Sequence, residues 1–400
     1  MSIETIETIP AFCQYLIDNN LLINTPIQVI DIGARSGFET HWEKFGDNCA
    51  ISGFEPDKEE CKQINQALKS SNRKCYPCAI WSSKGIKSLT IARNIASSGL
   101  LKADLEQIYR YQFKGTLEPV SEFSVQTITL DEWKSKQSKQ MDYIKIDVEG
   151  GEFEVISGAL RILRDEIIAC NVETWIASVH ERQADLGKTI TLMKDLGFEL
   201  YDMELHKYPK KVLPESLHTH NQGTGQLVWG QSLFIKDVAR QIKSEPTKWH
   251  KTRLLKAIAI FELHGLVDCA IELLLDAANL SIVDTSEREL YLNLLTPQIL
   301  GDQSITYNQY MAIKTLEISH FFLRHTINQP TGEVKSALEF IDTIHRLVER
   351  FKNKKLETSD TWIDDFLCNF TQNWYRYHGD IQDIVQNHWM CFKQDRMVLC

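Results

Sequence analysis

The stretch MDYIKIDVEGGEFEVISGA, residues 141–159, joins a strand pattern to a helix pattern. Its apolar run ends at Asp147 and Glu149, two glycines follow, and an apolar spacing typical of a helix begins at once. Carboxylates are costly in a packed interior unless they are paired or reach solvent. We therefore expect a central strand whose tip carries both acids at a ligand-binding edge, with the glycines allowing a sharp turn into the helix.

Short apolar runs alternate with helical patterns through the first 240 residues. This alternation predicts an α/β fold, in which helices cover both faces of a mostly parallel sheet. The predicted strands are 27–32, 50–55, 143–148, 167–173, 198–205 and 226–236. The segments SLTIA (88–92) and FSVQTIT (123–129) interrupt the alternation and predict an added hairpin or a lid.

The alternation of strand and helix patterns ends in KDVARQIKSEPTKWH, residues 236–250, and from about residue 246 the pattern is helical throughout. We predict an α/β domain over residues 1–240 and an all-helical domain over 246–400. TRLLKAIAIFELHG and LVDCAIELLLDAANL, separated by Gly265, predict an αα-hairpin. Further helices are expected near 285–296, 304–323, 334–353 and 360–376.

Composition narrows the class of protein. The 400 residues carry a formal charge of −10, which opposes non-specific binding to nucleic acid or to an anionic membrane. No segment is long and apolar enough to predict a membrane span, and the acidic start does not resemble a signal peptide. The ten scattered cysteines are then expected to be reduced thiols in a cytoplasmic protein. Cys75 and Cys78 form a lone CxxC without a second pair, a weak indication of zinc.

A glycine turn follows the first predicted strand, in VIDIGARSGFET (29–40). Gly33 and Gly37 allow tight turn dihedrals and a close approach of a ligand to the backbone, and a helix follows. The nicotinamide-dinucleotide fingerprint needs a glycine where Arg35 stands. Taken alone, the turn is also compatible with a purely structural role.

An acid follows the second strand, in ISGFEPD (51–57). Glu55 at this tip can accept hydrogen bonds from ribose hydroxyls. At the tip of a third strand, in CAIWSSKG (78–85), the backbone of Ile80 and the side chain of Ser82 are placed to meet a base. Together with Asp31 and the glycine turn, these tips predict a nucleoside pocket at the carboxyl edge of the sheet.

The segments VIDIGARSG, GFEPD, TITLDEWKSKQSKQMDYIKIDVEGGEFEVISGALRIL and CNVET resemble the FkbM family of S-adenosylmethionine-dependent methyltransferases. The resemblance covers about residues 25–236. It implies the class I methyltransferase fold, a Rossmann-like seven-stranded sheet whose last strand runs antiparallel. It also implies S-adenosylmethionine as cofactor and methyl transfer to hydroxyl groups, commonly of sugars, glycolipids or polyketide-type natural products.

The resemblance assigns each part of the cofactor to residues. It places the methionine part over residues 33–37 and its amino group near Asp31, the ribose at Glu55 and the adenine at residues 79–82. The predicted cofactor contacts are Asp31, Gly33, Ala34, Arg35, Gly37, Glu55, Ile80 and Ser82. Three positions depart from the family: Arg35 replaces a common asparagine, Gly151 the usual alanine, and Ser82 a frequent aspartate.

Three acids are the predicted catalytic residues. Methyl transfer to an alcohol requires that the acceptor oxygen be held in line and that its proton be removed. We predict Asp147 as the orienting group or general base, Glu149 as its support and Glu173 as a third acid on the same edge.

Several alternatives stay open for this edge of the sheet. In one alternative, Lys145 forms a purely structural ion pair with Asp147 or a neighbouring acid. In another, Glu149 only holds its loop through backbone N–H groups. In a third, His180 and not an acid is the general base. Asp147 and Glu149 with Glu173 could also hold a divalent cation, although our prediction includes no metal.

The leading functional hypothesis is an O-methyltransferase acting on a hydroxyl of a carbohydrate, glycolipid or natural product. Two others compete: a nucleotide-dependent oxidoreductase, which Arg35 disfavours, and a non-catalytic nucleotide-binding scaffold whose helical part is a protein-interaction module. The expected partner is a small-molecule or glycan acceptor rather than nucleic acid, with possible homo-oligomers through the helical part. The segments 93–122 and 206–225 are expected to set acceptor specificity.

Overall fold

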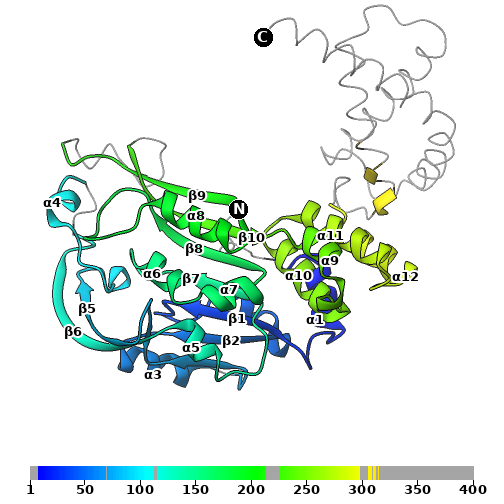
Figure 1. Cartoon of the computed structure of the whole chain (residues 1–400), viewed down its shortest axis with the longest axis horizontal. Coiled ribbons are helices and arrows are strands. Elements are labelled where there is room, and N and C mark those ends of the chain that lie inside the picture. The colour runs from blue at the N-terminus through cyan, green and yellow to red at the C-terminus, as the bar shows by residue number, and fades with distance from the viewer. Residues whose placement is uncertain are drawn as a thin grey trace, which may run out of the picture. The chain divides into compact units, whose positions relative to one another are not determined.

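Seven strands form the central sheet of the protein (Figure 1). In spatial order they are β3 (Arg73–Tyr76), β2 (Cys49–Phe54), β1 (Ile27–Ile32), β7 (Tyr143–Ile146), β8 (Ala169–Trp175), β10 (Gln226–Lys236) and β9 (Phe198–Tyr208). The first five are parallel, and β10 runs antiparallel to both of its neighbours. This confirms the predicted class I methyltransferase fold, including the reversed last strand.

The computed structural model describes residues 8–68, 70–111, 115–212, 225–297, 305–308, 310–311 and 314. The longer helices among them are α1 (Ala11–Asp18), α3 (Lys58–Ala67), α8 (Leu186–Asp195), α9 (Val238–Ser244), α10 (Lys251–Leu263), α11 (Val267–Asn279) and α12 (Thr285–Leu295). The shorter ones are α2 (Thr40–Glu43), α4 (Leu105–Ile108), α5 (Leu130–Lys134), α6 (Glu152–Ser157) and α7 (Leu160–Asp165). None of these helices combines the length and the apolar character needed to cross a bilayer.

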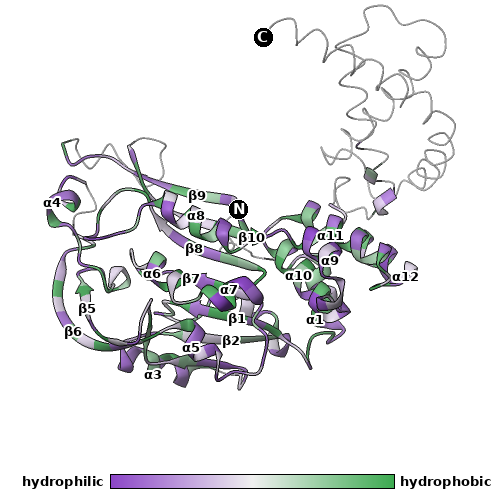
Figure 2. Cartoon of the chain, in the orientation of Figure 1, coloured by the Kyte–Doolittle hydropathy of each residue, from purple (hydrophilic) through white to green (hydrophobic). Residues whose placement is uncertain are grey.

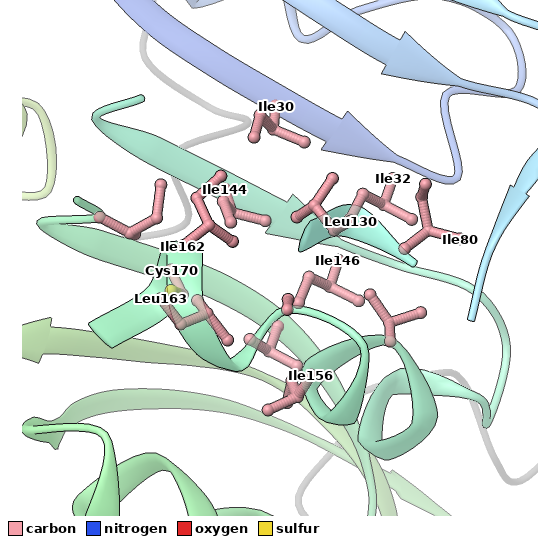
Figure 3. Close-up of a cluster of buried hydrophobic side chains, with 14 of the residues drawn as sticks. Ile30, Ile32, Ile80, Leu130, Ile144, Ile146, Ile156, Ile162, Leu163 and Cys170 are labelled. Carbon is pink, nitrogen blue, oxygen red and sulfur yellow. The ribbon is translucent and has the colours of Figure 1, made fainter. Parts of the chain in front are cut away.

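The main core lies between one face of the sheet and helices α5 to α8. Ile30 and Ile32 of β1 and Ile144 and Ile146 of β7 point to this face, because side chains alternate along a strand. They meet apolar side chains of the helices, among them Leu130, Ile156, Ile162 and Leu163, as Figure 3 shows. Packing on this face fixes the positions of the strand tips.

The intervening residues of the same strands point to the opposite face. Tyr143 contacts Trp42 of α2, with 5.1 Å between the ring centroids, and stacks on His264 at the end of α10. Lys145 and Asp31 also point to this side, so the ion pair that they form lies behind the strand tips.

The predicted hairpin is present as a second, small sheet. Strands β5 (Gly85–Ala92) and β6 (Pro119–Ile128) pair antiparallel, and β4 (Ala79–Ile80) joins β6. The sequence predicted one third strand ending near residue 80, whereas the structure has β3 in the main sheet and β4 in the small one. Pro77 between them has no N–H to donate, so the ladder of the main sheet stops there.

Helix α10 is buried along most of its length, and Figure 2 shows its largely hydrophobic colouring. The Glu262 side chain accepts hydrogen bonds from the backbone N–H groups of Phe12 and Cys13, at 3.0 and 2.8 Å. Lys256 Nζ lies 2.8 Å from Oδ2 of the buried Asp142. The α10–α11 hairpin confirms the predicted pattern around Gly265, whose φ is +72°.

Contacts divide the chain into residues 1–283 and 284–400. In the second unit, α12 begins with a capping box between Asp284 and Glu287. The predicted helices at 304–323, 334–353 and 360–376 lie wholly or mostly outside the described residues. The domain boundary near residues 240–246 therefore stays a prediction, although α10 and α11 group with the first unit.

The cysteines that the structure describes are free thiols. They are Cys13, Cys49, Cys61, Cys75, Cys78, Cys170 and Cys269. Burial raises the pKa of Cys78, the less buried member of the CxxC, to about 11, which makes this thiol a poor nucleophile.

Candidate active site

A cavity of about 510 Å³ opens at the carboxyl ends of the parallel strands. Its walls follow the order of the sheet: Glu55 after β2, Gly33 after β1, Asp147 after β7 and Glu173 on β8. Ligands of open α/β sheets bind at this edge, and the volume suits a small molecule. The tips that the sequence singled out therefore meet at one cavity.

The glycine turn is tight because β7 passes directly behind it. Gly33 has φ of +91°, and a Cβ on this residue would lie 1.7 Å from the carbonyl oxygen of Asp147. Ser36 and Gly37 also have positive φ, at 69° and 105°. Position 33 thus requires glycine for two independent reasons, conformation and space.

Glu55 is held by two donors at the wall of the cavity. Its Oε1 accepts a hydrogen bond from the Asp57 N–H at 2.8 Å and from Arg35 Nη2 at 3.4 Å. Arg35 Nη2 also lies 3.3 Å from Asp57 Oδ2. Burial raises the pKa of Glu55, while the Asp57 N–H and the Arg35 guanidinium lower it. The other oxygen, Oε2, receives no hydrogen bond from the described residues and remains available to a ligand.

Asp147, Glu149 and Glu173 form an acidic cluster, with one carboxylate oxygen from each within 4.8 Å of the others. Burial and neighbouring carboxylates raise the pKa of Glu149 and Glu173 well above the ordinary range. Glu173 Oε2 also accepts a hydrogen bond from Trp175 Nε1 at 2.9 Å. A cluster of this kind can take up and hold a proton at neutral pH.

Lys145 supplies the positive charge beside this acidic cluster. Its Nζ lies 3.4 Å from Asp147 Oδ2 and 3.7 Å from Asp31 Oδ1. Burial by itself would lower the pKa of Lys145, but the carboxylates of Asp31 and Asp147 raise it above the ordinary value. The structural pairing that the sequence left open is therefore present, and it leaves Asp147 lining the cavity.

The three carboxylates are also ligands that a divalent cation prefers. Mg²⁺ usually takes only one or two protein carboxylates and keeps several waters, so three oxygens would be enough. Our prediction of a metal-free site remains untested.

The backbone that presents Glu149 is held in an unusual conformation. Glu149 has φ of +59° and Gly150 of +95°. Glu152 Oε1 accepts the N–H groups of Val148 and Gly150, at 3.1 and 3.0 Å, and thereby fixes the turn. Sequence reasoning did not assign this role to Glu152; its signal was an acid in the first turn of the helix directly after two glycines.

His180, the alternative base, packs behind this turn rather than lining the cavity. A Cβ on Gly150 would lie 2.6 Å from His180 Nδ1, and the imidazole meets the Trp175 ring edge-on. Burial lowers the pKa of His180 to about 4. This histidine supports the turn through packing.

The predicted site residues divide into two groups. Those that line the cavity are Gly33, Arg35, Glu55, Ile80, Asp147, Glu149 and Glu173. Those that do not are Asp31, Ala34, Gly37 and Ser82. Asp31 pairs with Lys145, and the Ser82 hydroxyl donates a hydrogen bond to the Glu154 side chain. Ligand contacts of all these residues remain predictions.

Sequence reasoning missed Trp175, Trp229 and Gln231, which also line the cavity. Trp81 and Tyr208 line it as well, and they lie within the predicted adenine segment 79–82 and the predicted specificity segment 206–225. Residues 94 and 96–100, within the predicted specificity segment 93–122, form another wall. A Cβ at Gly99 would lie 2.9 Å from the Glu149 carbonyl oxygen, so this segment packs directly on the acidic turn.

Trp81 explains why glycine stands at position 151. A Cβ on Gly151 would lie 2.6 Å from Cζ3 of the Trp81 ring. We expect Gly151→Ala to lower the free energy of unfolding by about 1–3 kcal/mol through overpacking. Urea unfolding measures this change.

Two further variants make that experiment decisive. Gly115→Ala is the control, because no atom lies within 4 Å of a Cβ at Gly115. Adding Trp81→Phe to Gly151→Ala should recover part of the lost stability, since the smaller ring leaves room for the methyl group. Equal stability of the Gly151→Ala and Gly115→Ala proteins would contradict the expected overpacking.

The α/β part of the sequence matches a known family of protein domains. Residues 31–200 match the family described as Methyltransferase FkbM domain. The chain contains an FkbM methyltransferase domain. The match spans the glycine turn, Glu55 and all three acids of the cluster. FkbM enzymes are S-adenosylmethionine-dependent, so S-adenosylmethionine is the cofactor that accompanies this domain, whereas the acceptor is not established.

Solved structures of methyltransferases resemble the FkbM domain distantly. Magnesium protoporphyrin IX methyltransferase from Synechocystis PCC 6803, solved with S-adenosylmethionine, is 8% identical; the match covers 56% of this chain and 76% of that one, with a TM-score of 0.29. The N-terminal domain of EvdMO1, solved with S-adenosylhomocysteine, is 12% identical over 56% and 80%, with a TM-score of 0.27.

A third structure, 1,6-didemethyltoxoflavin-N1-methyltransferase from Burkholderia thailandensis, is 9% identical over 59% of this chain and 81% of that one, with a TM-score of 0.28. No curated protein matches the sequence.

Proposed function

We propose that the protein is an S-adenosylmethionine-dependent O-methyltransferase that methylates a hydroxyl of a carbohydrate, glycolipid or natural product. The observation that carries this proposal is the placement of the acidic cluster. Asp147, Glu149 and Glu173 share one cavity with the glycine turn and with Glu55. This placement supports a proton acceptor next to the proposed nucleoside-binding edge.

The residues of the cavity fit the cofactor. Glu55 offers an oxygen with no partner among the described residues, as a ribose hydroxyl requires, and its hydrogen bonds to Asp57 and Arg35 fix its orientation. Ile80 and Trp81 give apolar surface for an adenine ring. The acidic cluster lines the same cavity, and a sulfonium cation there would favour the ionised form of its carboxyl groups.

The chain's own groups then have distinct tasks. When bound, S-adenosylmethionine supplies the electrophilic methyl group. Asp147 orients the acceptor hydroxyl and accepts its proton, so that the oxygen is free to form the new bond to carbon. Glu149 and Glu173 receive hydrogen bonds from the acceptor or share the proton. The 94–100 wall, packed on the acidic turn, excludes water from the reacting oxygen.

Calorimetry with two ligands tests the cofactor. We expect S-adenosylhomocysteine to bind with a micromolar or lower Kd and NAD not to bind, because Arg35 occupies a position that the dinucleotide motif reserves for glycine. Binding of NAD alone would reverse the proposal in favour of an oxidoreductase, and binding of neither ligand would favour the non-catalytic scaffold.

Two further expectations come from the sequence alone. They are self-association through the helical part of the chain and a cytoplasmic location. Most of that helical part lies outside the described residues.

A further inference from the structure

Four cavity-lining side chains form a panel on strands β8 and β10. Glu173 pairs with Gln231, and Trp175 pairs with Trp229, across the antiparallel ladder. Directly paired residues point to the same face of a sheet, and so do residues two positions apart. The four side chains therefore lie in two adjacent rows, one polar and one aromatic, and all four reach the cavity.

The polar row contains an amide with unused hydrogen-bonding capacity. Gln231 Oε1 is buried and accepts no hydrogen bond from the described residues. Buried polar groups in proteins almost always have partners, so an exception calls for an explanation. A ligand hydroxyl, which both donates and accepts, satisfies an amide in either orientation.

The aromatic row is held rigidly. The His206 ring stacks on Trp229 with 3.8 Å between centroids and an interplanar angle of 8°. Trp175 is fixed by its hydrogen bond to Glu173 and by edge-on contact with His180. The two indole centroids are 6.3 Å apart. Rings fixed in this way bind an apolar surface without a large loss of side-chain entropy.

The position of the panel separates it from the cofactor edge. The glycine turn and Glu55 follow β1 and β2, whereas the panel lies on β8 and β10, with Asp147, directly after β7, between them. Glu173 belongs both to the panel and to the acidic cluster. A molecule on the panel therefore reaches the proton acceptor from the side away from the nucleoside pocket.

We propose that Trp175, Trp229 and Gln231 form the acceptor subsite and bind a saturated ring that carries several hydroxyl groups. The C–H face of such a ring packs on the indoles, and one of its hydroxyls pairs with the Gln231 amide while another reaches the acidic cluster. A flat aromatic acceptor with a single hydroxyl would use the indoles but could not reach Gln231 and the acidic cluster at once. The assignment rests on the proposed methyltransferase function.

Ligand-observed saturation-transfer NMR tests the subsite on the full chain saturated with S-adenosylhomocysteine. The probes are the methyl β-pyranosides of glucose, galactose and xylose, and catechol as the flat alternative. We expect at least one pyranoside to receive saturation, mainly at its C–H protons. Trp229→Ala and Gln231→Leu should each weaken its binding about tenfold or more, as expected for an anchor residue or a lost hydrogen bond to a buried amide.

Matched variants separate recognition from folding. Trp229→Phe keeps an aromatic surface and should retain most of the affinity. Gln126→Leu, at an exposed position of β6 outside the cavity, should leave pyranoside binding unchanged. In all four variants the Kd of S-adenosylhomocysteine should stay within about twofold of wild type, because the panel lies outside the nucleoside pocket.

The outcomes distinguish the two proposals. The subsite is overturned if S-adenosylhomocysteine binds but no pyranoside does, if only catechol binds, or if pyranoside binding survives both Trp229→Ala and Gln231→Leu. If pyranosides bind through the panel but S-adenosylhomocysteine does not bind, the methyltransferase proposal fails and the ring-binding subsite stands.

Discussion

Replacing Asp147 by asparagine should lower kcat by about 10²- to 10⁴-fold, the usual contribution of a positioned general base. Asparagine keeps the shape of the side chain but cannot accept the proton of the acceptor hydroxyl. The Kd of S-adenosylhomocysteine should change by less than about threefold, because the nucleoside edge at Glu55 is intact. Transfer of a labelled methyl group from S-adenosylmethionine to pooled hydroxylated acceptors measures kcat, and calorimetry measures the Kd.

The Asp147 experiment has a matched control and a clear contrary result. Asp195→Asn changes an exposed aspartate at the end of α8 and should leave both quantities unchanged. A loss of cofactor affinity as large as the loss of kcat would assign Asp147 to cofactor binding instead. An unchanged kcat would indicate that Glu149 or Glu173 accepts the proton instead. The variants Glu149→Gln and Glu173→Gln would then show which of the two does so.

Replacing Glu55 by alanine should raise the Kd of S-adenosylhomocysteine about 100-fold, the value of one or two hydrogen bonds to a charged group. The expected loss comes from the free Oε2, which no described residue uses, and from the Arg35 guanidinium, which is then left with Asp57 alone. Glu55→Gln keeps one acceptor oxygen and should give an intermediate Kd. Calorimetry on both variants measures the change.

Glu59 provides the comparison for Glu55. It lies on α3 with an exposed side chain, so Glu59→Ala should bind S-adenosylhomocysteine as wild type does. If Glu55→Ala retained wild-type affinity, the ribose would have to be held elsewhere on the cavity wall. The turnover of Glu55→Ala at saturating cofactor should remain near wild type, which distinguishes this residue from Asp147.

Local sequence rules predicted the strand tips and the turns between them. Gly33 stands where φ is positive and where β7 leaves no room for a Cβ, and Asp147 and Glu149 end a run of buried apolar residues. Such features depend on neighbours along the chain and on the alternation of β and α elements. The mostly parallel sheet, the hairpin of β5 and β6 and the meeting of the acids could therefore be predicted without coordinates, whereas the count of seven strands was implied by the resemblance to the FkbM family.

Contacts between distant segments were not predictable in the same way. The ring of Trp81 fills the space that Gly151 leaves, although 70 positions separate the two residues in the sequence. Arg35, which in the sequence only excluded a dinucleotide motif, holds Glu55 in place. Each contact depends on side-chain direction as well as on position in the sequence.

The sequence by itself determined the α/β fold and placed Glu55 and the three acids at one edge of the sheet, because apolar periodicity and glycine turns act locally. The tertiary structure alone decided which other side chains share the cavity. Trp175 and Trp229 are 54 positions apart in the sequence, and only the antiparallel register of β8 and β10 makes them neighbours. If β10 were shifted by one residue against β8, Trp229 and Gln231 would turn to the face opposite Trp175, so the shared wall of the cavity depends on strand pairing.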